Sequence, residues 1–349
     1  MVPTSTNSFS NPNRVTWAAP SNIALVKYWG KKGFQIPANA SLSLTLSKAF
    51  TKTTLSWEPK TGNELRFEFL FEGKENFKFY EKVKKVIFHL SQELPFLLNH
   101  KLKIETENTF PHSTGIASSA SSMAALALCF CSMEEEVLGP QGDFFKRASY
   151  LARIGSGSAA RSIFGEFVRW GEIEGEGSDL YASQLDSFHP IFSKLRDTVL
   201  IVSSEEKKLS STNGHKLMDD SSSSSKERYL QANKNVLKML EILKSGDLIS
   251  FGKILEEEAL TLHTHIITST KGEVLLMDTN SLEIIERVRK FRKEKKLDLY
   301  FTMDAGPNIH LLYPKEQEME INSFIESELL KYCESYIPDE MGNGPWILA

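Results

Sequence analysis

Cysteine is scarce in this sequence, which contains only Cys129, Cys131 and Cys333 among its 349 residues. Three cysteines at these spacings cannot form the disulfide framework that holds small secreted domains together. Cys129 and Cys131 lie in the apolar run 124–131. We therefore expect reduced thiols that pack in a hydrophobic core.

Long apolar runs are also missing. No stretch reaches the roughly 18 apolar residues that a membrane-spanning helix requires. Residues 1–14 are rich in Ser, Asn and Pro and lack the apolar region of a secretory signal. The sequence therefore predicts a disordered leader over 1–14, a cytoplasmic location and no membrane partner.

An excess of one charge is lacking as well, because 41 Lys and Arg residues balance 45 Asp and Glu residues. This balance excludes a broad electrostatic surface for nucleic acid, so an anionic ligand must be recognised by a local basic cluster. The 41% of hydrophobic residues excludes disorder of the whole chain. At roughly 100–200 residues per domain, the length predicts about two domains. We place them at 15–190 and 191–349.

Residue patterns predict a β-rich first third and a β/α alternation in the second half. Segment 15–46 alternates short apolar pieces with Pro, Asn and Ser, and 51–71 is typical of strands joined by a turn at 61–63. Apolar side chains recur at three- and four-residue steps in 77–94, which indicates a helix. The other predicted elements are strands near 102–105, 199–203, 298–303 and 309–313, and helices over 123–132, 144–154, 226–244, 248–265, 282–296 and 321–332.

A small, hydroxyl-rich segment at 111–122 leads into the predicted apolar helix at 123–132. The N-terminus of a helix offers unpaired N–H groups, and Gly115 with small neighbours allows a phosphate to approach the backbone. The segment lacks the lysine of a Walker loop. A helix start that only packs closely would show the same pattern, and Ser118 and Ser119 suit helix capping as well as phosphate or magnesium binding.

Lys27 follows an apolar strand, an unusual place for a side chain that is rarely buried without a partner. It pairs with a carboxylate or phosphate, or it emerges into solvent at the strand end; the sequence alone leaves both open. The adjacent Lys31 and Lys32 have the character of surface residues.

Two further segments suit anion binding. Gly and Ser alternate over 155–158 and Arg161 follows, with a planar guanidinium that matches carboxylate or phosphate geometry. A surface arginine after a glycine-rich linker is the alternative. Asp304 ends a strand before the tight turn 304–308, where it either caps its own backbone or projects into a cleft.

Several known site patterns are absent. His263 and His265 are two residues apart rather than four, so they do not form an H-E-x-x-H metal site. Neither a G-x-S-x-G elbow nor a dinucleotide-binding fingerprint occurs. The run Ser221–Ser225 is a solvated loop or a lid over a site, and its composition favours the solvated loop.

Taken in order, these segments resemble the diphosphomevalonate decarboxylase family of the GHMP kinase superfamily. The matching segments are 19–31, 37–45, 110–119, 155–162 and 303–308. The resemblance implies an α+β, two-domain GHMP kinase fold, with a left-handed β-α-β element in the N-terminal domain and a ferredoxin-like C-terminal domain. It also implies an active site in the cleft between the domains, and a homodimer.

The resemblance further implies a reaction, in which ATP and mevalonate diphosphate give isopentenyl diphosphate, carbon dioxide, ADP and phosphate. Asp304 would orient or deprotonate the tertiary hydroxyl, Arg161 would hold the substrate carboxylate, and Lys27 would lie beside Asp304. A carboxylate near two cations favours its ionised form. We therefore expect positioning to contribute more than proton abstraction.

By the same resemblance, the remaining site residues bind the two substrates. Those assigned to mevalonate diphosphate are Tyr28, Lys31, Ser156, Gly157, Ser158, Ser211 and Thr212. Those assigned to ATP are Pro111, Gly115, Ala117, Ser118, Ser119 and Ser121, with Ser118 and Ser119 also as Mg²⁺ ligands.

Two positions depart from the family pattern: some members carry Arg where Thr212 stands, and Glu166 replaces the second residue of the usual Gly-Gly before Phe167. They leave open whether the substrate is the diphosphate or the monophosphate. The alternatives are a phosphomevalonate decarboxylase, a mevalonate-type kinase without decarboxylation, and a protein that binds nucleotide without turnover.

Overall fold

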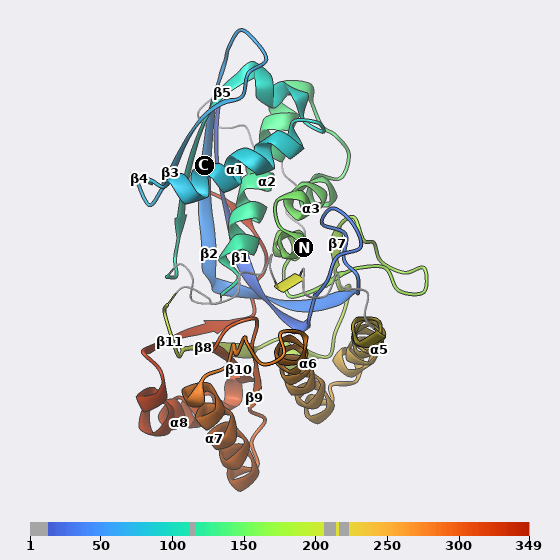
Figure 1. The fold of residues 1–349 in the computed structure, drawn as a ribbon, viewed down its shortest axis with the longest axis vertical. Coiled ribbons are helices and arrows are strands. Elements are labelled where there is room, and N and C mark those ends of the chain that lie inside the picture. The colour runs from blue at the N-terminus through green and yellow to red at the C-terminus, as the bar shows by residue number, and fades with distance from the viewer. Residues whose placement is uncertain (1–12, 112–115, 206–213, 216–222, 349) are drawn as a thin grey trace.

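The chain folds into two α+β domains stacked along its long axis (Figure 1). The computed structural model describes residues 13–111, 116–205, 214–215 and 223–348. One domain is built on a mixed sheet of eight strands and the other on an antiparallel sheet of four. The α+β prediction is confirmed.

The larger sheet is formed by the first half of the chain together with its last strand. Its strands are β1 (Arg14–Val26), β2 (Ser41–Pro59), β3 (Arg66–Phe71), β4 (Lys74–Glu75), β5 (His100–Asn108), β6 (Phe167–Trp170), β7 (Ala182–Gln184) and β12 (Trp346–Ile347). The predicted turn 61–63 joins β2 to β3, but these strands do not pair, because β5 lies between them. β5 runs parallel to β3. Helix α1 (Phe77–Leu90) supplies part of the crossover that a parallel pair requires.

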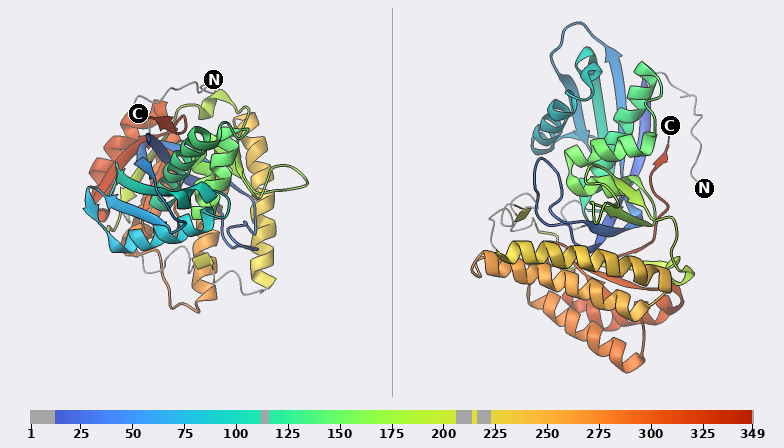
Figure 2. Two further views of the ribbon diagram at one scale, coloured as in Figure 1. Left: turned by 90° about the horizontal axis from the view of Figure 1, so that it is seen from above. Right: turned by 90° about the vertical axis from the view of Figure 1, so that its right-hand side faces the viewer.

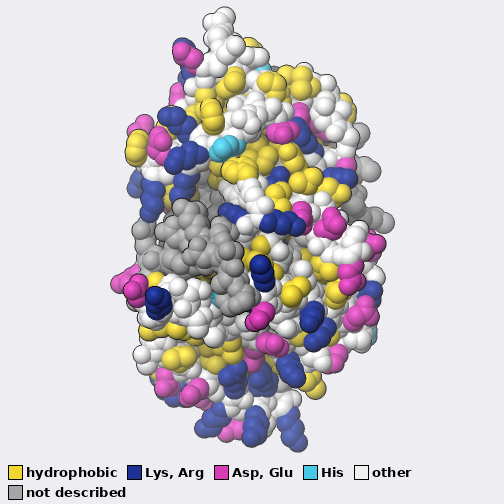
Figure 3. All heavy atoms as spheres, turned by 45° about the vertical axis from the view of Figure 1, so that its right-hand side comes forward, with side chains coloured by type: hydrophobic (Ala, Val, Ile, Leu, Met, Phe, Trp, Pro, Cys, Tyr) yellow, Lys and Arg dark blue, Asp and Glu magenta, His cyan; other side chains and the backbone are white. Residues whose placement is uncertain are grey.

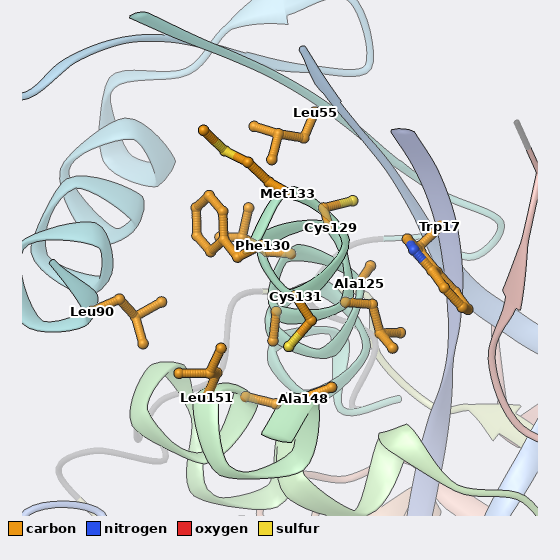
Figure 4. Close-up of a cluster of buried hydrophobic side chains, with 14 of the residues drawn as sticks. Trp17, Leu55, Leu90, Ala125, Cys129, Phe130, Cys131, Met133, Ala148 and Leu151 are labelled. Carbon is orange, nitrogen blue, oxygen red and sulfur yellow. The ribbon is translucent and has the colours of Figure 1, made fainter. Parts of the chain in front are cut away.

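Three helices form the main core of this domain, together with one face of the sheet: α1, α2 (Ser118–Leu138) and α3 (Phe144–Gly155). Figure 4 shows the cysteines of α2 pointing in different directions, Cys129 toward the strands and Cys131 toward Ala148 of α3. The thiol of Cys129 donates to the carbonyl of Thr53 at 3.4 Å. Both thiols are buried and unpaired, as predicted.

The second domain has the ferredoxin-like β-α-β-β-α-β order that the resemblance implied. Its strands are β8 (Leu195–Ile201), β9 (Tyr300–Thr302), β10 (Ile309–Pro314) and β11 (Ser335–Glu340), in the spatial order β11-β8-β10-β9. Its helices are α5 (Ser223–Ser245), α6 (Leu248–Ser269), α7 (Thr279–Lys295) and α8 (Glu318–Phe324), which a π-helical turn continues over Ile325–Leu329. The long helices lie in layers, with α5 and α6 against the larger sheet and α7 farther from it (Figure 2).

Most long helices begin at a polar cap. The side chains of Asn76, Asp143, Asp247 and Asp278 each accept a backbone N–H from the first turn of the helix that follows. Such caps satisfy N–H groups that have no partner within the helix. Helix α2 is different, because Ala117 precedes it and supplies no side-chain cap.

Three predicted boundaries need correction. Arg14, placed in the leader, is the first residue of β1, and Asn13 before it is exposed; the rest of the leader, 1–12, lies outside the described residues. Helix α2 begins at Ser118 rather than 123, so its first turn contains the serines; the hydroxyl of Ser122 donates to the carbonyl of Ser118 at 2.7 Å within that turn. The run 191–349 includes β12, which pairs with β1 and so belongs to the larger sheet.

Two further predictions concern membranes and the serine run. Among the described residues, no helix is long and apolar enough to cross a membrane. Of the run Ser221–Ser225, residues 221 and 222 lie outside the described part of the chain, and α5 begins at Ser223. Ser225 is helical and 2% exposed, so the solvated-loop interpretation is wrong at that residue.

Candidate active site

A cleft of about 410 Å³ opens where the two domains meet. Its walls come from the end of β1, the start of α2, the 3-10 helix at Gly157–Ile163, helix α6 and the turn after β9. Lys and Arg side chains gather on this side of the molecule (Figure 3). The predicted residues Lys27, Arg161 and Asp304 all line this one cleft.

Lys27 and Asp304 form an ion pair that joins the two domains. Lys27 directly follows β1, and Asp304 lies in the turn between β9 and β10. The Nζ atom of Lys27 is 3.0 Å from Oδ1 of Asp304 and donates to the carbonyl of Ala24 at 2.7 Å. The lysine side chain is 2% exposed and the aspartate 30%. Of the two alternatives for Lys27, the structure shows the carboxylate partner.

Arg161 is held in the wall of the cleft rather than on the surface. Its Nη1 donates to the hydroxyl of Ser41 at 2.7 Å, and its Nε and Nη2 each donate to Oδ1 of Asn22 at 3.3 Å. Burial lowers the pKa of Arg161 to about 10, against the opposing effect of the Asp304 charge. The guanidinium therefore stays protonated at neutral pH and faces a ligand as a fixed cation.

The N-terminus of α2 reaches the same cleft. Ala117 and Ser119 line it, and Ala117 adopts a left-handed conformation with φ of +40°. With no side-chain cap, the first N–H groups of α2 can bind an anion. Ser121 differs: it is buried and its hydroxyl lies 2.6 Å from that of Thr51. Of the described residues predicted to bind ATP, Pro111, Ser118 and Ser121 do not line the cleft.

The residues predicted to bind the diphosphate line the same cleft where they are described. Those that line the cleft are Tyr28, Lys31, Ser156, Gly157 and Ser158. Gly157 has no room for a side chain, because an added Cβ would lie 2.8 Å from the Tyr28 hydroxyl and 2.9 Å from the ring of Trp170. Gly115, Ser211 and Thr212 lie outside the described residues.

The cleft also contains polar groups that the sequence analysis missed: Asn22, Gln35, Lys82, Lys85 and His215. Lys82 and Lys85 are three apart and so share a face of α1, a signal that helical periodicity could have supplied. Among the described residues, the lining holds the cations Lys27, Lys31, Lys82, Lys85 and Arg161 and one carboxylate, Asp304. This is the local basic cluster expected of a protein that binds anions without a net positive charge.

Two buried histidines beside the cleft are neutral. Burial lowers the pKa of His215 to about 3 and that of His263 to about 4. The Nδ1 atom of His215 accepts the backbone N–H of Gly30 at 2.9 Å, so the proton of this neutral ring is on Nε2. The Nε2 atom of His263 lies 3.0 Å from the carbonyl oxygen of Asp304 and therefore carries the proton of its own ring.

These histidines make stability dependent on pH. The unfolded chain protonates the His263 ring near pH 6.5, and the folded chain only near pH 4, so falling pH favours unfolding. Its contribution to stability is complete above pH 6.5, and about 2 kcal/mol is lost at pH 5. His263→Gln should remove this loss. Urea unfolding at pH 7.5 and pH 5 measures it, and an equal pH dependence in both proteins would contradict the expectation.

The donor atoms suit magnesium bound mainly through a nucleotide. No cluster of three or more His, Cys, Asp or Glu occurs in the described part of the chain that could hold a metal by itself. The cleft offers the Asp304 carboxylate and the Ser119 hydroxyl. Because Mg²⁺ is commonly held by one or two carboxylates together with substrate phosphates, these oxygens fit Mg-ATP.

Two protein-family models match the chain. Residues 19–182 match the diphosphomevalonate decarboxylase-like N-terminal domain, and residues 198–340 match the mevalonate 5-diphosphate decarboxylase C-terminal domain. The diphosphomevalonate decarboxylase of Saccharomyces cerevisiae is 32% identical over 328 residues, which are 88% of this chain and 79% of the yeast protein. The chain belongs to the diphosphomevalonate decarboxylase family.

Solved structures of the family share this fold over nearly the whole chain. Mevalonate diphosphate decarboxylase from Staphylococcus aureus has a TM-score of 0.84 at 29% identity, covering 97% of this chain and 98% of that one. A second structure, "MDDEF in complex with MVAPP, AMPPCP and Magnesium", has a TM-score of 0.82 at 30% identity, covering 96% and 98%. The family resemblance seen in the motifs is thus confirmed.

Proposed function

We propose that the chain catalyses the ATP-dependent decarboxylation of mevalonate diphosphate to isopentenyl diphosphate, ADP, phosphate and carbon dioxide. The observation that carries this proposal is the Lys27–Asp304 pair, which lies with Arg161 in one cationic cleft. The family membership supports it, as does the related complex that contains MVAPP, AMPPCP and magnesium.

The tertiary hydroxyl of the substrate is a poor leaving group, so phosphorylation comes first. The hydroxyl oxygen bonds to the γ-phosphorus of ATP, the bond to ADP breaks, and the Asp304 carboxylate orients the hydroxyl and receives its proton. The new phosphate ester then breaks at carbon. The electrons of the carbon–carboxylate bond form the double bond as carbon dioxide leaves.

Fixed charges assist both steps. The ammonium of Lys27 faces the transferring phosphoryl group beside Asp304, and the guanidinium of Arg161 holds the carboxylate that will be lost. Both cations are 2% exposed, so water screens them little and their attraction for an anion is stronger than on a surface. Phosphoryl transfer depends mainly on such positioning and charge stabilisation.

The two ends of the cleft suit the two polyphosphates. We assign the diphosphate of the substrate to Tyr28, Lys31, Ser156 and Ser158. We assign ATP to the open N-terminus of α2, with Lys82 and Lys85 of α1 as additional phosphate ligands. Magnesium would neutralise phosphate charge, and the hydroxyl of Ser119 would help to hold it.

The departure at Glu166 does not alter these assignments. Its φ of +56° lies in the region that favours glycine, and its backbone N–H donates to Gly342 at 2.8 Å. Glu166 is not among the residues that line the cleft. We therefore assign the open choice between diphosphate and monophosphate to the Thr212 position, which lies outside the described residues.

The test is to supply purified protein with Mg-ATP and mevalonate diphosphate, mevalonate phosphate or mevalonate, and to measure ADP and carbon dioxide together. We expect equal amounts of both products from the diphosphate and little from the other two. ADP without carbon dioxide would make the protein a kinase. Decarboxylation of the monophosphate alone would assign the altered specificity to the Thr212 region.

A further inference from the structure

Two buried side chains of α6 contact the main chain of the Lys27–Asp304 pair. Glu258 accepts a hydrogen bond from the backbone N–H of Lys27 at 2.9 Å, and the Nε2 of His263 donates to the backbone carbonyl of Asp304 at 3.0 Å. Each is 1% exposed. One helix therefore holds both halves of the ion pair, although Lys27 comes from the end of β1 and Asp304 from the turn after β9.

Glu258 is itself fixed by a network of donors from α5. Its Oε2 accepts from Nη2 of Arg228 at 2.6 Å, and its Oε1 accepts from Nδ2 of Asn235 at 2.7 Å. Arg228 is 5% exposed and Asn235 is 1% exposed. A buried ion pair is weak evidence for a stabilising role, because desolvation opposes the attraction. The geometry of the Arg228–Glu258 pair has a separate effect, because it fixes the Glu258 oxygen that accepts the backbone N–H of Lys27.

The neighbouring contacts limit the movement of both backbones. Nδ2 of Asn39 donates to the carbonyl of Lys27 at 2.9 Å, so Lys27 is held at both its N–H and its C=O. On the other side, Ala305 packs with Leu262 of α6 and with Trp29 in a buried apolar cluster. The Nζ–Oδ1 distance therefore depends on α6, because neither side chain can reach its partner unless both main chains are in place.

We propose that Glu258 and His263 are positioning residues that hold the main chains of Lys27 and Asp304 at the separation their reaction requires. The inference rests on the proposed function of that ion pair. Neither residue touches the reacting atoms. Each acts through the backbone of the residue it binds.

A matched pair of double variants tests Glu258. Replacing Glu258 alone would leave Arg228 buried without its counter-charge, which destabilises folding. In Arg228→Met/Glu258→Gln, the glutamine oxygen still accepts the Lys27 N–H. In Arg228→Met/Glu258→Met, no acceptor remains, while the charge and bulk of the network stay comparable.

Relative to the glutamine protein, the methionine protein should exchange the Lys27 amide hydrogen about 10-fold faster, because one hydrogen bond is lost. Its kcat should fall about 10- to 100-fold, since a misplaced reacting group lowers the rate without weakening ground-state binding. The KM for ATP should stay within about 3-fold. Because loss of folded protein would also lower the apparent kcat at constant KM, kcat is expressed per folded molecule, with the folded fraction measured by circular dichroism.

His263 offers an independent pair. His263→Leu removes the donor to the Asp304 carbonyl, whereas His263→Gln supplies an amide N–H in its place. We expect kcat to fall about 10-fold in the leucine protein and to recover largely in the glutamine protein. The rescue separates positioning from packing, because leucine fills the apolar surroundings at least as well.

Failure of this inference and failure of the proposed function give different experimental results. A wild-type protein that turns over none of the substrates refutes the function, and amide exchange at Lys27 still tests the positioning without substrate. Equal exchange in the two double variants overturns the role of Glu258. Equal kcat in the leucine and glutamine proteins overturns that of His263.

Discussion

Asp304→Asn should lower turnover at least about 1,000-fold while leaving nucleotide binding nearly unchanged, an effect in the range of a lost catalytic base. The amide keeps the shape of the side chain and can still accept from Lys27 Nζ, which lies 3.0 Å from the native carboxylate. It loses the charge that orients the substrate hydroxyl and accepts its proton. Initial-rate measurement of ADP release gives the turnover, and calorimetric titration with a non-hydrolysable ATP analogue gives the affinity.

Asp298→Asn is the matched control for this variant. Asp298 lies just before β9 and Asp304 just after it, so both substitutions remove one carboxylate near the same strand. The Asp298 carboxylate accepts from the hydroxyl of Tyr300 at 3.0 Å, a bond that asparagine retains. Its turnover should remain near that of the wild type. Turnover of Asp304→Asn within 10-fold of wild type would remove Asp304 from the reaction.

Arg161→Met should raise the KM for mevalonate diphosphate and lower kcat together, so that kcat/KM falls about 100- to 1,000-fold. Methionine keeps much of the buried stem but loses every donor, and a hydrogen bond to a charged group is worth about 1.5–3 kcal/mol. The hydroxyl of Ser41 and the amide oxygen of Asn22 also lose their partner. Nucleotide affinity should hardly change, because Arg161 is assigned to the other substrate.

Arg161→Lys is the graded comparison for the methionine protein. Lysine restores the positive charge without the planar fork, so it should recover part of the lost kcat/KM but not the full value. Melting temperatures of the three proteins show whether folding is preserved. If kcat and KM of Arg161→Met equal those of the wild type, the arginine has only a structural role.

Sequence reasoning singled out three residues that the structure brings into one cleft, because each stands in a short, distinctive setting. Lys27 follows an apolar strand, Arg161 follows alternating glycine and serine, and Asp304 begins a tight turn. Helix α3 was predicted within one residue at its end, because its apolar stripe is regular. For α3, the apolar periodicity and the N-cap at Asp143 were together sufficient to predict both ends of the helix.

The supporting residues could not be found in this way. Glu256, Glu257 and Glu258 are consecutive in the sequence, where they have the character of a solvated acidic run, yet Glu258 is 1% exposed and Glu257 is exposed. Glu256 is buried as well, where it pairs with Arg289 and Arg292. The partners of Glu258 are Arg228 and the Lys27 backbone, 30 and 231 residues away in the sequence. The position of β5 between β2 and β3 is likewise set by the sheet as a whole rather than by any turn residue.

The pairing of β12 with β1 means that the polypeptide crosses between the domains twice, once near residue 190 and again between β11 and β12. At the second crossing, the chain packs closely against β2, because a Cβ added at Gly342 would lie 2.2 Å from the carbonyl oxygen of Leu46. Two tethers remove the free swivelling that one linker would allow. Because α6 also binds the main chains of both Lys27 and Asp304, the ion pair lies at a joint that covalent and non-covalent connections both hold.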